Sequence, residues 1–132
     1  MSGESPGWVM SPDTVPYVDP AFVLGNSPSY ATLLTWTLAD GEAVTVQGTL
    51  VITRGSGATV TRRTIEITAS AKKQGVSSVA ITSPVLTSNG DGPVVQVRWV
   101  ASGADTVTLN LRDNAGSTAH VAFTHRVVRA TP

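Results

Sequence analysis

From residue 32 to the C-terminus, apolar and polar side chains alternate with a period of two. The segment 33–38 places Leu34, Trp36 and Leu38 on one parity and threonines on the other. The segment 43–53 does the same over a longer run, and its residues of shared parity are Val44, Val46, Gly48, Leu50 and Ile52. Strict alternation is typical of a β-strand with one buried face. Both segments are therefore predicted to be strands that turn these residues inward.

Alternating segments continue along the rest of the chain. The segment 58–70 turns Ile65 and Ile67 inward, and the others are 76–83, 94–101, 106–112 and 117–128, with 85–87 as one more candidate. Turns rich in Gly, Asn and Asp separate these segments, and none of them has a helical period. We predict an all-β fold, an antiparallel sandwich or jelly roll of about seven to eight strands.

Two local features of the sequence predict a turn and an irregularity within a strand. Asp40–Gly41 lies between the first two strands, and Asp-Gly is a strong signal for a tight β-hairpin. Val60 has the opposite parity from Ile65. A change of parity within one strand suggests a β-bulge or a twist, which we expect near Arg62–Arg63.

Residues 1–31 differ from the rest of the chain. They hold Pro6, Pro12, Pro16, Pro20 and Pro28, five of the eight prolines, and have no period of either kind. Proline removes a backbone donor and favours extended geometry before it, so we predict an extended N-terminal arm followed by a β-domain over 32–132. Disordered tails are poor in aromatic residues, and we expect this arm to pack on its own domain, a neighbouring subunit or a larger assembly. Its candidate anchors are Trp8, Tyr17, Phe22, Leu24 and Tyr30.

Composition narrows the choice of function. The 132 residues include no cysteine, which rules out disulfides and cysteine-bound metals, and nine basic residues balance nine acidic ones. Nucleic-acid binders usually have a strong basic excess, so we expect no nucleic-acid partner. The first ten residues lack the basic and apolar regions of a secretory signal, and no apolar stretch approaches the roughly 20 residues of a membrane span. We expect a soluble protein made in a cytoplasm, without membrane insertion.

Residues 38–130 combine strands and turns in an order that resembles a known domain. The stretch LADGEAVTVQGTLVITRGSGATVTRRTIEITASAKK is a polar turn, a Val-rich strand, a Gly-rich loop and a strand ending in basic residues. The closing part runs from Thr106–Leu111 through the turn Asp113–Gly116 to a last strand, Val121–Val128. This order resembles a β-domain of tailed-bacteriophage virion proteins, which occurs in tail fibres, tail spikes and related appendages.

The resemblance implies a non-enzymatic structural domain that assembles as a trimer and projects from the virion. Its implied partners are sister subunits, other virion proteins through residues 1–31, and a glycan or receptor on the host surface. The last strand of that family often carries a tryptophan, whereas this chain has Ala119–His120, which weakens any inference of a shared binding surface. Two alternatives stay open: a capsid decoration protein whose arm clamps neighbouring capsomers, and a carbohydrate- or receptor-binding module.

The two histidines, His120 and His125, are the strongest candidates for a chemical site. Strand residues separated by an odd number point to opposite faces, so these histidines cannot share a metal ion unless a bulge intervenes. His125 has the parity of Val121, Phe123 and Val127, and we expect it to be packed in the core or at a subunit interface. His120 is expected at the surface. The sequence therefore predicts no metal site.

Catalytic patterns are also missing. The chain has no G-x-S-x-G elbow before a helix and no phosphate-binding loop. Its acidic residues fall mostly in turns, where Asp bonds to local backbone groups. Trp36 and Trp99 have inward parity, which favours a place in the core over a role as sugar platforms. We predict no enzymatic activity and no cofactor.

Overall fold

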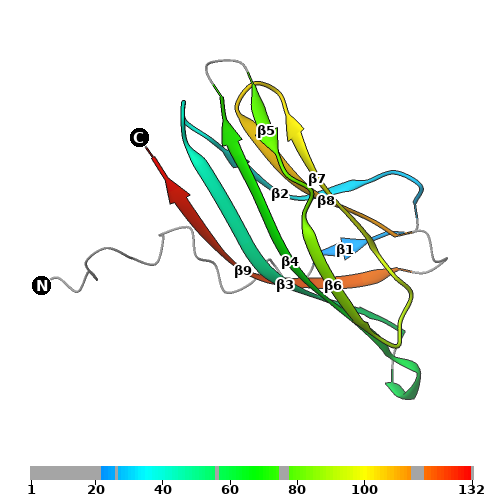
Figure 1. Cartoon of the computed structure of the whole chain (residues 1–132). Coiled ribbons are helices and arrows are strands. Elements are labelled where there is room, and N and C mark those ends of the chain that lie inside the picture. Colours follow the sequence, from blue (N-terminus) through cyan, green and yellow to red (C-terminus); the bar gives the residue numbers. More distant parts are fainter. Residues whose placement is uncertain (1–21, 26, 56, 75–77, 114–117, 132) are drawn as a thin grey trace, which may run out of the picture.

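The computed structural model describes residues 22–25, 27–55, 57–74, 78–113 and 118–131. Most of these residues lie in strands, and every strand pairing is antiparallel, which confirms the predicted all-β class. The helical part of the described chain is a single 3₁₀ turn, η1 (Gly57–Thr59). The strands form two sheets in a sandwich-like arrangement (Figure 1).

The larger sheet is built around the longest strands. Its order is β1-β9-β3-β4-β5, and β6 pairs with β4 on the same side as β5. The bounds of these strands are β1 (Val23–Leu24), β3 (Ala43–Arg54), β4 (Thr61–Lys73), β5 (Val79–Ile81), β6 (Val85–Gly90) and β9 (Ala119–Ala130). Because β3 pairs along its whole length with both β4 and β9, it forms the centre of the sheet.

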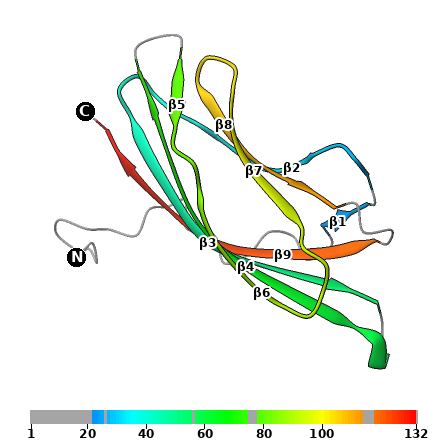
Figure 2. The ribbon, with the colours of Figure 1, turned by 45° about the vertical axis from the view of Figure 1, so that its right-hand side comes forward.

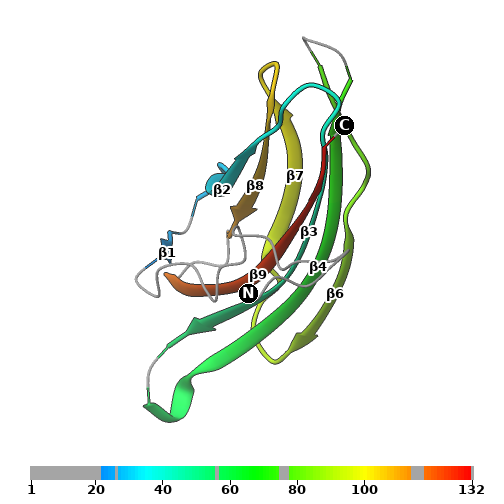
Figure 3. The ribbon, with the colours of Figure 1, turned by 90° about the vertical axis from the view of Figure 1, so that its left-hand side faces the viewer.

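The smaller sheet has the order β2-β8-β7. Its strands are β2 (Ala31–Thr37), β7 (Gln96–Ser102) and β8 (Thr106–Arg112). Figure 2 shows it as a layer over part of the larger sheet. The ends of β3 and β4 that flank η1 extend beyond this layer (Figure 3). The larger sheet is therefore covered by the smaller one over only part of its length.

The core lies between the two sheets and follows the predicted alternation. Val46 and Leu50 of β3 and Val107 of β8 are completely or almost completely buried. Trp36 and Trp99 are also buried, as predicted, with ring centroids 5.6 Å apart. The indole Nε1 of Trp99 donates a hydrogen bond to the carbonyl of Ser70 at 2.9 Å, so this side chain links the smaller sheet to the backbone of the larger one.

The Asp40–Gly41 turn does not form the predicted hairpin. Gly41 has the expected positive φ of 77°, but β2 pairs with β8 while β3 belongs to the other sheet. The reason is that β4 and β9 occupy both edges of β3, and no edge remains for β2. The turn therefore carries the chain from one sheet to the other.

Of the bulge or twist predicted near Arg62–Arg63, the bulge is absent from the pairing of β3 with β4. The β3–β4 register is unbroken from Ala43 opposite Lys72 to Arg54 opposite Thr61. Val60 precedes the strand, and its parity is therefore not constrained by the pairing. The irregularity lies in β2 instead, between Thr32 and Leu34, where the pairing with β8 shifts.

The described part of residues 1–31 packs on its own domain. Val23 and Leu24 of β1 pair with His120 and Ala119 of β9, and Leu24 is 2 % exposed. The carbonyl of Phe22 accepts a hydrogen bond from the amide of Val121 at 3.0 Å. The last ten residues of the predicted arm are therefore largely part of the β-domain, while residues 1–21 lie outside the described chain.

Gly48 makes room for an aromatic ring in the centre of the core. It lies on β3 opposite His125 of β9. A Cβ atom at Gly48 would lie 2.6 Å from Cζ of Phe123 and 2.8 Å from the carbonyl oxygen of Thr124. Real Cβ atoms essentially never approach other atoms so closely. The ring of Phe123 can therefore lie over β3 at this point only because Gly48 has no side chain.

We expect Gly48→Ala to lower the free energy of unfolding by about 1–3 kcal/mol, the usual cost of overpacking a filled core. Gly25→Ala is the matched control, because an added Cβ there meets nothing within 4 Å. Urea denaturation of both variants measures the difference. Equal midpoints for the two variants would contradict the role given to Gly48.

Candidate functional site

The two histidines of β9 lie on opposite faces of the sheet, as predicted. His125 is 5 % exposed and stacks on Phe123, with ring centroids 4.9 Å apart and planes 7° from parallel. The ring of Trp36 lies nearly perpendicular to that of His125, with ring centroids 5.9 Å apart. His120 is exposed and opposite Val23 and Thr53. His125 is thus a packed residue of the domain core, and the two imidazoles do not form a common site.

The described residues offer neither a group of metal ligands nor a membrane-spanning helix. Among them, no three His, Cys, Asp or Glu side chains gather in a group that could hold a metal ion. The described chain also has no helix that is long and apolar enough to cross a membrane.

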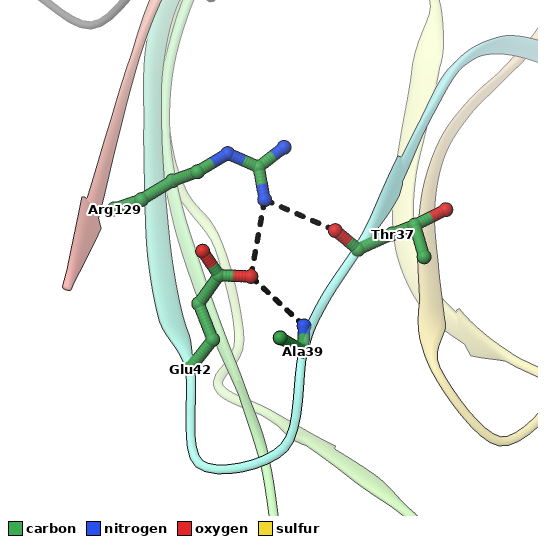
Figure 4. A network of polar contacts seen from close by, with 4 residues as sticks. All are labelled: Thr37, Ala39, Glu42 and Arg129. Carbon is green, nitrogen blue, oxygen red and sulfur yellow. Dashed lines mark hydrogen bonds and ion pairs between the residues drawn. The ribbon is translucent and has the colours of Figure 1, made fainter. Parts of the chain in front are cut away.

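A buried carboxylate organises the turn between the sheets (Figure 4). Glu42 is 5 % exposed, and its Oε1 accepts a hydrogen bond from the amide of Ala39 at 2.9 Å. The same oxygen lies 3.3 Å from Nη1 of Arg129, which also donates to the carbonyl of Thr37 at 3.0 Å. Residues of β2, β9 and the turn therefore meet at Glu42. Since its acceptor oxygen is used for structural contacts, Glu42 is a weak candidate for acid–base chemistry.

A second buried ion pair lies elsewhere in the larger sheet. Nη1 of Arg54 at the end of β3 contacts Oδ2 of Asp113, and both side chains are almost fully buried. The backbone carbonyl of Asp113 also accepts a hydrogen bond from the amide of Ser27 at 2.9 Å. Buried charges are normally paired because an isolated one is costly. This pair joins the chain after β8 to the central strand and has a structural explanation.

Asp91 holds the end of β6 against β4. Its Oδ1 accepts a hydrogen bond from the amide of Arg62 at 2.8 Å, and this bond lowers the pKa of Asp91 below its ordinary value of 3.8. The amides of Asp91 and Gly92 both donate to the carbonyl of Arg62, at 2.9 and 3.2 Å. The acidic turn around Asp91 therefore serves to fix strand β6.

The outer face of the larger sheet is broad and carries mainly short polar side chains. The Ser and Thr residues at its outward positions are Thr45, Thr49, Thr53, Thr64, Thr68, Ser70, Thr87 and Thr124. Within this face, a shallow hollow of about 280 Å³ lies over β3, β4 and β5. The hydroxyls of Thr45 and Ser70 are 2.9 Å apart in its lining. Its lining is mostly apolar and Lys72 is its one charged residue, which gives little basis for specific small-molecule binding.

Strand β6 forms an open edge of the larger sheet (Figure 3). It pairs with β4 along one side, and among the described strands none pairs with its other side. All six residues of β6 are exposed and none is charged, and Val85 and Leu86 are 68 % and 42 % exposed. Proteins usually protect a free edge with charges or proline. An uncharged edge that begins with two exposed apolar residues is therefore a candidate surface for strand pairing.

A cationic cluster lies on the outer face of the smaller sheet. Gln96 of β7 is directly opposite Arg112 of β8, and Arg98 is opposite Asn110. The guanidinium carbons of Arg98 and Arg112 lie 4.0 and 4.9 Å from the ring centroid of Tyr30. Oε1 of Gln96 accepts a hydrogen bond from Nη2 of Arg112. We call Tyr30, Gln96, Arg98 and Arg112 the arginine–tyrosine cluster.

The predicted arm anchors fall into three groups. Trp8 and Tyr17 lie outside the described residues. Phe22 and Leu24 pack on the core of their own domain, and Tyr30 lies in the arginine–tyrosine cluster. The residues missed from the sequence are Gln96, Arg98 and Arg112. Their outward positions could be predicted from the sequence. Their contacts around Tyr30 could not, because these depend on the register of β7 with β8.

Comparison with known proteins gives no further guide to function. No protein-family model matches the chain, and neither the curated proteins nor the solved structures include a match.

We expect Glu42→Ala to lower the free energy of unfolding by about 2–3 kcal/mol, because it removes a hydrogen bond and a charge-assisted contact from a buried turn. Asp40→Ala is the control. Its carboxylate pairs with Lys73 but is 61 % exposed, and exposed pairs contribute about 0–1 kcal/mol. Thermal and urea unfolding report both values. A larger loss at Asp40 than at Glu42 would show that the buried network does not hold the turn.

Proposed function

We propose that this protein is a non-enzymatic structural component of a tailed-bacteriophage particle, of the tail-fibre or appendage type, which assembles with copies of itself. The resemblance of residues 38–130 to appendage β-domains motivates the choice of particle. The observation that carries the assembly is the open, uncharged edge at β6. The proposed assembly is a trimer, as in the appendage domains. In it the β6 edge of each copy pairs with a different edge of the next copy, because pairing of β6 with itself would close a dimer.

Strand β6 has the properties that strand pairing between copies requires. A second chain that extends the sheet gains main-chain hydrogen bonds along the edge. Pro84 and Pro93 lie outside β6, so no residue within it lacks a backbone donor. Val85 and Leu86 have opposite parities, so an added strand would find apolar side chains on both faces of the edge. No charge in β6 opposes such contact.

The buried acids support a structural role over catalysis. Glu42 and Asp113 each pair with an arginine and connect elements that are distant in sequence. A general acid or base must reach a substrate, whereas these carboxylates are enclosed by the fold. A capsid decoration protein remains the alternative, because an N-terminal arm and an open strand edge would serve equally well to attach a protein to neighbouring capsomers.

We expect the full-length chain to sediment as a trimer and the double variant Val85→Lys/Leu86→Lys to sediment as a monomer. Two lysines at a free edge oppose pairing by charge repulsion and desolvation. Val60→Lys is the control, because Val60 is 50 % exposed and lies outside every strand. Analytical ultracentrifugation gives the masses. A monomeric parent chain would refute assembly, and an unchanged mass of the double variant would exclude β6 as its surface.

We expect gold-labelled antibodies against the β-domain to bind the tail of intact phage particles in electron micrographs. The position follows from the appendage role. Labelling of the head would support the capsid decoration alternative. Absence of the protein from purified particles, tested by mass spectrometry, would contradict both.

A further inference from the structure

The arginine–tyrosine cluster holds positive charge without a matching negative one. Among the described residues, neither Arg98 nor Arg112 forms an ion pair, whereas Arg54, Lys73 and Arg129 each contact a carboxylate. The outward positions of the smaller sheet beside them carry Thr, Ser, Asn and Val and no acidic residue. This face is therefore locally cationic although the chain as a whole has no net charge.

The cluster is also held in place before any ligand arrives. Nη1 of Arg112 donates to the carbonyl of Pro28 at 3.3 Å, and its Nη2 donates to Gln96. Tyr30 is half-buried, and the guanidinium of Arg98 lies 4.0 Å from its ring centroid. Stacking on an aromatic ring orients a guanidinium and leaves its N–H groups free in its plane. No N–H group of Arg98 donates to another described residue, so the N–H groups of its guanidinium are available to a ligand.

The polar groups beside the two arginines are amides, which can form hydrogen bonds with hydroxyl groups. Oε1 of Gln96 is used by Arg112, which leaves the exposed amide nitrogen of Gln96 as a donor. Asn110, opposite Arg98, is 8 % exposed, and its Oδ1 finds no hydrogen-bond donor among the described residues. Buried polar atoms normally have a partner. Asn110 is nevertheless too buried to touch a surface ligand directly. The cluster therefore offers a ligand the exposed guanidinium of Arg98, the remaining N–H groups of Arg112 and the exposed amide nitrogen of Gln96, which can donate to a hydroxyl oxygen.

We propose that Arg98, Arg112 and Gln96, with Tyr30 as their support, form a binding site for an acidic saccharide. The carboxylate of the sugar binds the guanidinium groups, and its adjacent hydroxyls bind the amide of Gln96. This site lies on the smaller sheet and does not depend on assembly through β6.

The test is a titration of the full-length protein with D-glucuronate and N-acetylneuraminate, followed by two-dimensional ¹⁵N NMR at low ionic strength. We expect these sugars to shift the amide resonances of β7 and β8, and to bind about tenfold or more tightly than D-glucose or acetate, because the acid sugars alone engage both kinds of group. Added salt weakens the binding by screening.

Arg98→Gln and Arg112→Gln are expected to weaken the binding about tenfold or more, because each removes a charge-assisted hydrogen-bond donor. Arg126→Gln is the matched control. Arg126 also donates to a glutamine, Gln47, on the neighbouring strand, but it lies on the larger sheet. Circular dichroism of each variant verifies that the fold is intact.

Four results would overturn the proposal: no shift with either acid sugar, equal binding of D-glucose, equal binding of acetate, or an equal loss in Arg126→Gln. Sedimentation of the same samples tests the proposed assembly independently, because loss of saccharide binding leaves the mass of the oligomer unchanged.

Discussion

The pairing of β3 with both β4 and β9 is the constraint on which the rest of the structure depends. These contacts run along the whole central strand and leave it no free edge. Strand β2, although next in the chain, must therefore join the other sheet, and the turn between them becomes a corner that needs Glu42 and Arg129 to stabilise it. The same pairing places His125 and Phe123 over Gly48, where the missing side chain admits the rings.

The inward and outward faces of the long strands could be predicted from sequence because burial of one face imposes a period of two. Val46, Leu50, Phe123 and His125 are examples in which parity alone gave the correct side. Pairing partners could not be predicted in the same way. The Asp40–Gly41 turn has the local geometry of a hairpin, but the destination of β2 depends on competition for the edges of β3, which is a property of the whole fold.

For the candidate sites as well, the face on which a side chain lies could be predicted from the sequence, but the residues that it contacts could not. The outward parity of Gln96, Arg98 and Arg112 is a local property, and the turn after Ser102 places β7 and β8 side by side. Tyr30, by contrast, reaches the two arginines only because β2 pairs with the far side of β8. Similarly, Val85 and Leu86 can be recognised as apolar from the sequence, but their exposure follows from the place of β6 at the edge of the larger sheet, which no local pattern encodes.

The position of β9 has a consequence for how the chain folds as it is synthesised. Strand β9 lies between β1 and β3 in the sheet, so one edge of the central strand has no partner until residues 119–130 have left the ribosome. Contacts between strands that are distant in sequence, such as β3 and β9, are slow to form because a long loop must close first. During that interval the apolar face and free edge of β3 are open to other chains. The nascent domain is thus most exposed to misassembly just before β9 is made.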